Sequence, residues 1–242
     1  MNASAPPAAP EDRIVVVIDP GHGGRDPGAV SSSGLTEKTI TFDTSKRLRD
    51  VLAKSGNYEV VFTRDDDSYL VLDARTELAR KAGADLFVSI HADAHHDKSL
   101  RGASVYTLSE QASDRVAREL RDEGDFEIFD VDIADQPPEV GGILMDLAQR
   151  ETKNQSARFA QLLIPHLSEA APLLNNTHRR AGYKVLLAPD VPAVLVEIAF
   201  MSNVADEKNL RDPAWRQQIA VAIAEGIDDY FEERAVRQTA LN

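Results

Sequence analysis

The sequence IVVVIDPGHGG, residues 14–24, determines how the rest of the chain is interpreted. Its first five residues are a continuous β-branched run, which is typical of a strand buried on both faces. Asp19 and Pro20 follow, and the glycines around His22 then force the chain to turn. In an α/β fold, functional side chains gather just past the carboxyl ends of such strands. We therefore expect His22 to lie where such folds place their sites.

Working outward, runs of apolar residues alternate between the periods of strands and helices. Strands are predicted at residues 14–18, 58–63, 86–90, 101–106, 183–187 and 193–197, and helices at 37–52, 72–82, 109–123, 139–167 and 214–231. This alternation predicts an α/β fold with one mostly parallel mixed sheet and helices on both faces. We expect one domain over residues 13–236, a flexible linker at 1–12 and a tail at 237–242.

Composition excludes several classes of partner and chemistry. The 242 residues include 40 acidic and 27 basic side chains, giving a net charge of -13. A nucleic acid or an anionic membrane surface is disfavoured, because phosphate contacts need clustered Lys and Arg. No apolar run approaches the roughly 18 residues that a membrane-spanning helix needs, so we expect no membrane insertion. The absence of cysteine excludes disulfides and thiolate ligands, and residues 1–12 lack the apolar core of a signal peptide.

Four polar residues occupy predicted strand ends or a helix start: His22, Glu37, His91 and Glu197. Two imidazoles and one carboxylate suit zinc in a hydrolase and leave a fourth position open for water. A further carboxylate could then act as general base. Spacing alone leaves an ordinary structural interpretation equally open, because such His and Glu residues are often merely hydrogen-bonded or solvated. The other histidines, which we interpret as surface residues, are His95, His96, His166 and His178.

A resemblance to a known family favours the metal site. Residues 18–29, IDPGHGGRDPGA, closely resemble the opening motif of the zinc-dependent N-acetylmuramoyl-L-alanine amidases of the amidase-3 family. The pair at residues 37–38 resembles the second metal motif, residues 89–93 resemble the third, and residues 196–203 resemble the motif of the catalytic glutamate. Order and spacing agree over residues 14–231. The departures, Asp93 where Asn is common and Ala199 where Gly is common, affect none of the expected ligands.

This resemblance implies a function and a set of site residues. Peptidoglycan would be the substrate, cleaved at the amide bond between N-acetylmuramic acid and L-alanine. His22, Glu37 and His91 would hold Zn²⁺, and Glu197 would be the catalytic carboxylate. Three alternatives stay open: a related zinc carboxypeptidase acting on the stem peptide, a non-catalytic wall-binding module, and a regulatory scaffold.

An acidic stretch separates the third motif from the fourth. Residues 107–151 contain 13 acidic and 4 basic side chains. Members from Gram-negative cell division carry a helical insertion here that covers the active site until activators with LytM domains displace it. The resemblance, which includes residues 145–152, implies a regulatory lid over about 109–150 and a periplasmic location. We predict Glu123 as the carboxylate that blocks the zinc, with Glu119 and Glu127 as alternatives; a simple solvated surface is an equally open interpretation for any one of them.

Overall fold

The computed structural model describes residues 13–114, 127–128, 131–132 and 136–241. Its centre is a six-stranded sheet with the order β2-β1-β3-β8-β4-β7. The strands are β1 (Ile14–Pro20), β2 (Tyr58–Phe62), β3 (Leu86–His91), β4 (Ala103–Leu108), β7 (Leu173–Ala181) and β8 (Ala193–Glu197). Strands β2, β1, β3 and β8 run parallel, and β4 pairs antiparallel with β8. The predicted mostly parallel mixed sheet is confirmed.

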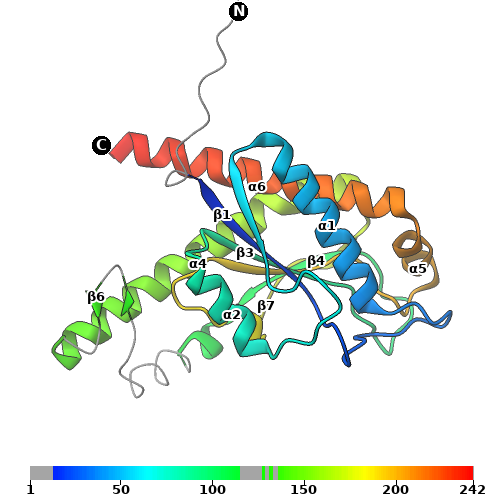
Figure 1. The fold of residues 1–242 in the computed structure, drawn as a ribbon, viewed down its shortest axis with the longest axis horizontal. Coiled ribbons are helices and arrows are strands. Elements are labelled where there is room, and N and C mark those ends of the chain that lie inside the picture. The colour runs from blue at the N-terminus through cyan, green and yellow to red at the C-terminus, as the bar shows by residue number, and fades with distance from the viewer. Residues whose placement is uncertain (1–12, 115–126, 129–130, 133–135, 242) are drawn as a thin grey trace, which may run out of the picture.

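Helices cover both faces of this sheet. The helices α1 (Glu37–Ser55), α4 (Pro138–Ala170) and α6 (Pro213–Leu241) pack on one face, whereas α2 (Leu72–Lys81) and the 3-10 turn η2 (Lys184–Leu186) pack on the other. In the view of Figure 1, α6 and α2 lie on opposite sides of the strands. A short helix, α5 (Val204–Arg211), leads into α6. Within the described residues, no helix is both long and apolar enough to span a membrane.

The β-branched run that opens the fold is buried on both sides, as predicted. Val16 and Ile18 face the larger core with α1, α4 and α6, and Val17 faces the smaller core with α2 and η2. All three side chains are fully buried. Burial of side chains this size contributes about 1.5–3 kcal/mol each, so β1 holds the two layers together.

The strand expected at residues 183–187 is wrong. Leu186 N donates to Tyr183 O, which makes this segment a 3-10 turn. Short apolar runs do not distinguish strand from helix, and here burial against α2 decides the conformation. The sixth strand of the sheet is β7, which the apolar pattern did not predict. Its sequence, LLNNTHRRA, is polar because it forms the edge of the sheet beside β4.

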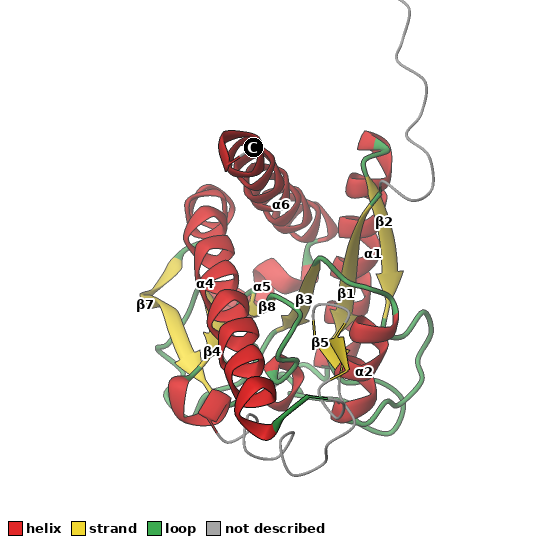
Figure 2. Cartoon of the chain, turned by 90° about the vertical axis from the view of Figure 1, so that its left-hand side faces the viewer, coloured by secondary structure: helices red, strands yellow, loops and turns green. Residues whose placement is uncertain are grey.

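The fold brings three separate strand ends to one edge of the sheet. Pro20 of β1 pairs in register with Ile90 of β3, and His91 pairs with Glu197 of β8. Figure 2 shows these central strands side by side between the helices. Parallel strands place their carboxyl ends together, so residues far apart in the sequence meet at this edge.

The acidic insertion is described only in part. Residues 110–114 are helical, and β5 (Glu127–Ile128) pairs antiparallel with β6 (Val131–Asp132). The long helix expected at 139–167 is confirmed as α4. The last helix continues past Phe231, where the sequence pattern ended it, to Leu241.

Candidate metal centre

Three side chains from separate segments converge at the carboxyl edge of the sheet. The Nε2 atom of His22 lies 3.0 Å from Oε2 of Glu37, and Nδ1 of His91 lies 3.0 Å from Oε1 of the same carboxylate. One ligand atom from each residue falls within 4.8 Å of the others. The two imidazole rings meet edge to face at 5.0 Å between centroids. The three residues that the resemblance implies as metal ligands thus lie together at this edge.

Glu37 is held rigidly at the centre of this cluster. It is the first residue of α1 and is 2% exposed. Backbone N–H groups of Ala29 and Ala92 donate to its two oxygens at 2.8 and 2.9 Å. Burial by itself raises the pKa of Glu37, but hydrogen bonds and charge from His22 and His91 outweigh burial and hold its pKa well below the usual value. Glu37 is therefore a carboxylate ready to accept a cation.

His22 is oriented from its other side. Its Nδ1 lies 2.9 Å from Oδ2 of Asp26, which directs Nε2 toward Glu37. A carboxylate on the second nitrogen is the usual arrangement for a metal-binding histidine. Burial by itself lowers the pKa of His22, but Glu37 and Asp26 together raise it above its ordinary value. The backbone of His22 has φ +62, an uncommon conformation for a residue with a side chain.

Two glycines let the ligands approach one another. A Cβ atom on Gly21 would lie 2.4–2.8 Å from three atoms of the His91 ring. Gly28 has φ +64, and a Cβ there would lie 2.5 Å from Oε2 of Glu37. Contacts this short are sterically excluded, so only glycine fits at both positions. The glycine-rich motif is thus required by the packing of the ligands themselves.

A buried polar layer supports the loop that carries His22. Arg75 donates to Asp19 at 2.7 Å and to the carbonyl oxygens of Pro20 and His22 at 2.9 and 2.7 Å. Arg64 donates to the carbonyls of Pro20 and Gly21. Carbonyls that turn away from a strand need donors when they are buried. Neither arginine could be predicted as a supporting residue from the sequence: Arg64 follows a predicted strand, Arg75 lies in a predicted helix, and no local motif marks either one.

Glu197 lies beside the cluster without joining it. It ends β8, opposite His91 in the register, and is 5% exposed. Its Oε2 accepts a hydrogen bond of 2.9 Å from the backbone N–H of Asp93. Burial raises the pKa of Glu197 well above its usual value, and the negative charges of Glu37 and Asp93 raise it further. A carboxylate with a raised pKa accepts a proton more readily than an ordinary glutamate.

The four predicted residues open onto one cavity of about 540 Å³. His22, Glu37, His91 and Glu197 all line it, together with apolar residues such as Tyr69 and Leu72. A concave site with a few convergent polar groups and perturbed pKa values is typical of an active site. The cavity is large enough for part of a polymeric substrate.

The other four histidines and the three candidate blocking glutamates lie apart from this cluster or outside the described residues. The other four histidines do not join the cluster among the described residues; His166, for example, lies 2.8 Å from Asp229 across α4 and α6. Glu119 and Glu123 lie outside the described residues, and Glu127 begins β5. The identity of a blocking carboxylate therefore stays a prediction.

The residues present fit a zinc ion. Two imidazoles and one carboxylate are the His2Glu donor set of many zinc hydrolases. Their ligand atoms lie within 4.8 Å of one another, and each imidazole contacts one oxygen of the Glu37 carboxylate directly. The second nitrogen of His22 also has the carboxylate partner expected of a ligand.

Comparisons with known proteins agree with this geometry. The chain is 36% identical to AmiC from Escherichia coli, aligned over 95% of this chain and 56% of that protein. It is 38% identical to AmiA from Escherichia coli, over 90% of this chain and 76% of that protein. Both relatives are named N-acetylmuramoyl-L-alanine amidases, and the chain spans little more than half the length of AmiC.

A solved structure shares the fold. The catalytic domain of CwlV, an N-acetylmuramoyl-L-alanine amidase from Bacillus (Paenibacillus) polymyxa, superposes with a TM-score of 0.65 at 27% identity. The match covers 90% of this chain and 98% of that domain. The sequence pattern of the Amidase_3 family, described as N-acetylmuramoyl-L-alanine amidase, matches residues 16–229. The chain therefore belongs to the Amidase_3 family of N-acetylmuramoyl-L-alanine amidases.

Proposed function

We propose that this protein is a zinc-dependent peptidoglycan hydrolase that cleaves the amide bond between N-acetylmuramic acid and L-alanine. The observation that carries the proposal is the cluster of His22, Glu37 and His91 with Glu197 beside it, at the edge where an α/β sheet places its active site. Family membership supports the same reaction.

Each side chain has a distinct task in this reaction. His22, Glu37 and His91 would hold the zinc. When bound, zinc supplies Lewis acidity to a carbonyl and lowers the pKa of water to about 7. The raised pKa of Glu197 suits a group that takes a proton from the attacking water and passes it to the departing L-alanine nitrogen. The hydrogen bond from Asp93 N fixes Glu197 Oε2 during this exchange.

Product analysis tests the bond that is cut. Purified sacculi are incubated with the protein, and the released material is analysed by mass spectrometry. The proposal predicts intact stem peptides with a free L-alanine amino terminus and a glycan without peptides. Release of single D-alanine residues would instead identify a carboxypeptidase, and binding to sacculi with no release would identify a wall-binding module.

The acidic insertion is proposed to regulate access to the site. Residues 107–151 carry a net charge of -9, and a metal with an open position attracts carboxylates. We infer that a carboxylate of the insertion, with Glu123 the first candidate, inhibits the enzyme by occupying that position. Deletion of residues 109–140 should then increase peptide release from sacculi, whereas unchanged or lower release by the folded deletion variant would contradict autoinhibition.

An activator protein would displace the insertion, and we propose a LytM-domain protein in the periplasm, acting during cell separation. Peptidoglycan lies outside the cytoplasmic membrane, which sets the compartment. The start of α4 exposes Val140, Ile143 and Leu147, which are 41%, 60% and 52% exposed and share one side of the helix. Exposed apolar residues at helical spacing suit a docking surface. The Ile143→Asp variant should lose activation by the partner but keep its activity after deletion of residues 109–140.

A further inference from the structure

Lys184 stands at the wall of the candidate active site. It is the first residue of η2 and lines the 540 Å³ cavity together with Tyr183 and Val185. Among the described residues that line this cavity, the Lys and Arg side chains are Lys184 and Arg75. Arg75 is buried and donates to Asp19 and to backbone carbonyls, so its charge is already engaged.

The ammonium group of Lys184 is available to a ligand. Its side chain is 58% exposed, and its ion pair with Asp73 is loose, at 3.8 Å, with Asp73 79% exposed. Ion pairs between exposed groups are weak, and water competes for both partners. A ligand that brings a better-placed carboxylate can therefore replace Asp73 as the partner of Lys184.

The backbone of this lysine is held in place although its side chain is exposed. Val185 and Leu186, the next two residues of η2, are buried beneath the sheet against α2. Tyr183 packs edge to face against Tyr106 at 5.2 Å between ring centroids. These contacts hold the backbone of residue 184 at the wall of the cavity.

The rest of the cavity is acidic. Its lining includes the carboxylates of Asp19, Asp26, Glu37, Asp93 and Glu197. Several of these carboxylates already face Arg75, His22 or His91, and a substrate carboxylate that meets the others is repelled unless a cation faces it.

Peptidoglycan stem peptides present such a carboxylate. After L-alanine comes D-glutamate, which continues the chain through its γ-carboxyl group and leaves its α-carboxyl group free. That group lies one residue from the scissile amide. Because an extended residue spans about 3.5 Å, the α-carboxylate stays within about 7 Å of the scissile amide, and Lys184 lines the same cavity as Glu197.

We propose that Lys184 recognises the α-carboxylate of the D-glutamyl residue and makes the enzyme selective for stem peptides in which that group is not amidated. Lys184 is a positioning residue that orients the peptide side of the substrate relative to Glu197. This inference rests on the proposed amidase function, because the substrate supplies the carboxylate.

Three small substrates isolate the contact. N-acetylmuramyl-L-alanyl-D-glutamate has both carboxylates, the D-isoglutamine analogue has an amide only in place of the α-carboxylate, and the D-glutamine analogue has an amide only in place of the γ-carboxylate. We expect wild-type kcat/KM to be about fivefold higher with either free α-carboxylate substrate than with D-isoglutamine, the factor that an exposed ion pair supplies. The difference should lie in KM.

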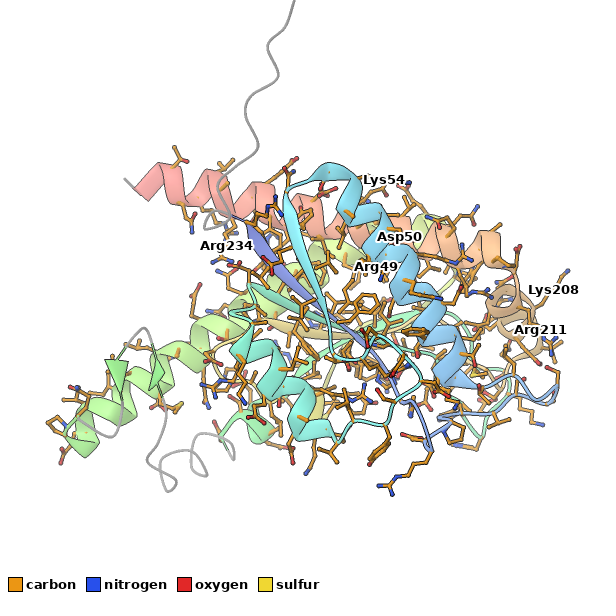
Figure 3. The ribbon with its side chains drawn as sticks, in the orientation of Figure 1. Arg49, Asp50, Lys54, Lys208, Arg211 and Arg234 are labelled. Carbon is orange, nitrogen blue, oxygen red and sulfur yellow. The ribbon has the colours of Figure 1, made fainter. Side chains whose placement is uncertain are left out.

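Matched variants assign the preference to one side chain. Lys184→Met should remove the preference by raising KM for the α-carboxylate substrates, with kcat unchanged, and Lys184→Arg should restore it. Lys54→Met is the control, because Lys54 lies in the last turn of α1, at the opposite end of the helix from Glu37 (Figure 3). This control should keep the wild-type preference.

Two outcomes would overturn the inference: equal kcat/KM for the three substrates in the wild type, or a preference that survives in Lys184→Met. Failure of the proposed function gives a different result, namely no release of L-alanyl peptide from any substrate. In that case the dissociation constants of the three compounds are measured by titration calorimetry. About fivefold tighter binding of the two compounds with a free α-carboxylate than of the D-isoglutamine compound would support the inference, and equal binding would overturn it.

Discussion

Arg75 of α2 and Asp19 of β1 form an ion pair of 2.7 Å in which both side chains are buried, at 2% and 0% exposure. Asp19 also accepts hydrogen bonds from Ser89 and Thr63. The same guanidinium group donates to the carbonyl oxygen of His22. This ion pair therefore links helix α2 and strand β1 to the loop that carries the proposed metal ligand His22.

Breaking this pair should destabilise the protein and loosen the metal centre. The Arg75→Met variant leaves Asp19 charged and buried, which costs about 3–5 kcal/mol in the free energy of unfolding. Urea unfolding followed by circular dichroism measures this loss. Lys81→Met is the control on the same helix, because its ion pair with Glu77 is exposed and should contribute less than about 1 kcal/mol. Equal stability of the two variants would contradict the supporting role of Arg75.

The Gly28→Ala substitution should abolish zinc binding without unfolding the protein. The new Cβ of Gly28→Ala meets the Glu37 carboxylate at 2.5 Å and strains a backbone at φ +64. Gly34→Ala is the matched control, because Gly34 also has a positive φ, at +80, but a Cβ there would meet no atom within 4 Å. Both variants carry the backbone strain of about 1–2 kcal/mol. Zinc content measured by atomic absorption should fall only in Gly28→Ala.

Zinc affinity should fall as the pH decreases through the pKa of His22. Burial lowers this pKa, but the Glu37 and Asp26 carboxylates raise it above the ordinary value of 6.5. Below the raised pKa the metal-free imidazole carries a proton, which zinc must displace, so affinity decreases up to tenfold for each pH unit. Asp26→Asn removes one of the groups that raise the pKa and should shift the decrease to lower pH. Competition with a chelator between pH 5 and pH 8 measures the effect, and a pH-independent affinity would contradict it.

Much of this site could be predicted from the sequence because its parts are local. The β-branched run at residues 14–18 fixes a buried strand, and the glycines after it fix a turn, so the position of His22 follows from neighbouring residues. His91 and Glu197 end similar apolar runs. Their meeting depends on strand order, which the alternation of strands and helices suggests through the βαβ pattern.

The 3-10 turn, the edge strand β7 and the buried ion pair could not be predicted, because they depend on contacts between residues far apart in the sequence. Residues 183–187 have the composition of a strand, and their packing against α2 makes them a 3-10 turn instead. The strand β7 is polar because it is an edge, so it lacks the apolar run of an inner strand. The pairing of Arg75 with Asp19 spans 56 residues and arises only from the fold.

Zinc content and peptide release, measured on the same preparations of wild type, His91→Ala and Glu197→Gln, test the proposed zinc amidase most directly. We expect one zinc per chain and release of peptides with a free L-alanine amino terminus from the wild type, and loss of both in His91→Ala. Glu197→Gln should retain its zinc but release peptides at least about a hundredfold more slowly, because the proton-transferring group is gone. Peptide release at the wild-type rate by Glu197→Gln, or a wild type that is active without any bound metal, would contradict the proposed zinc-dependent reaction.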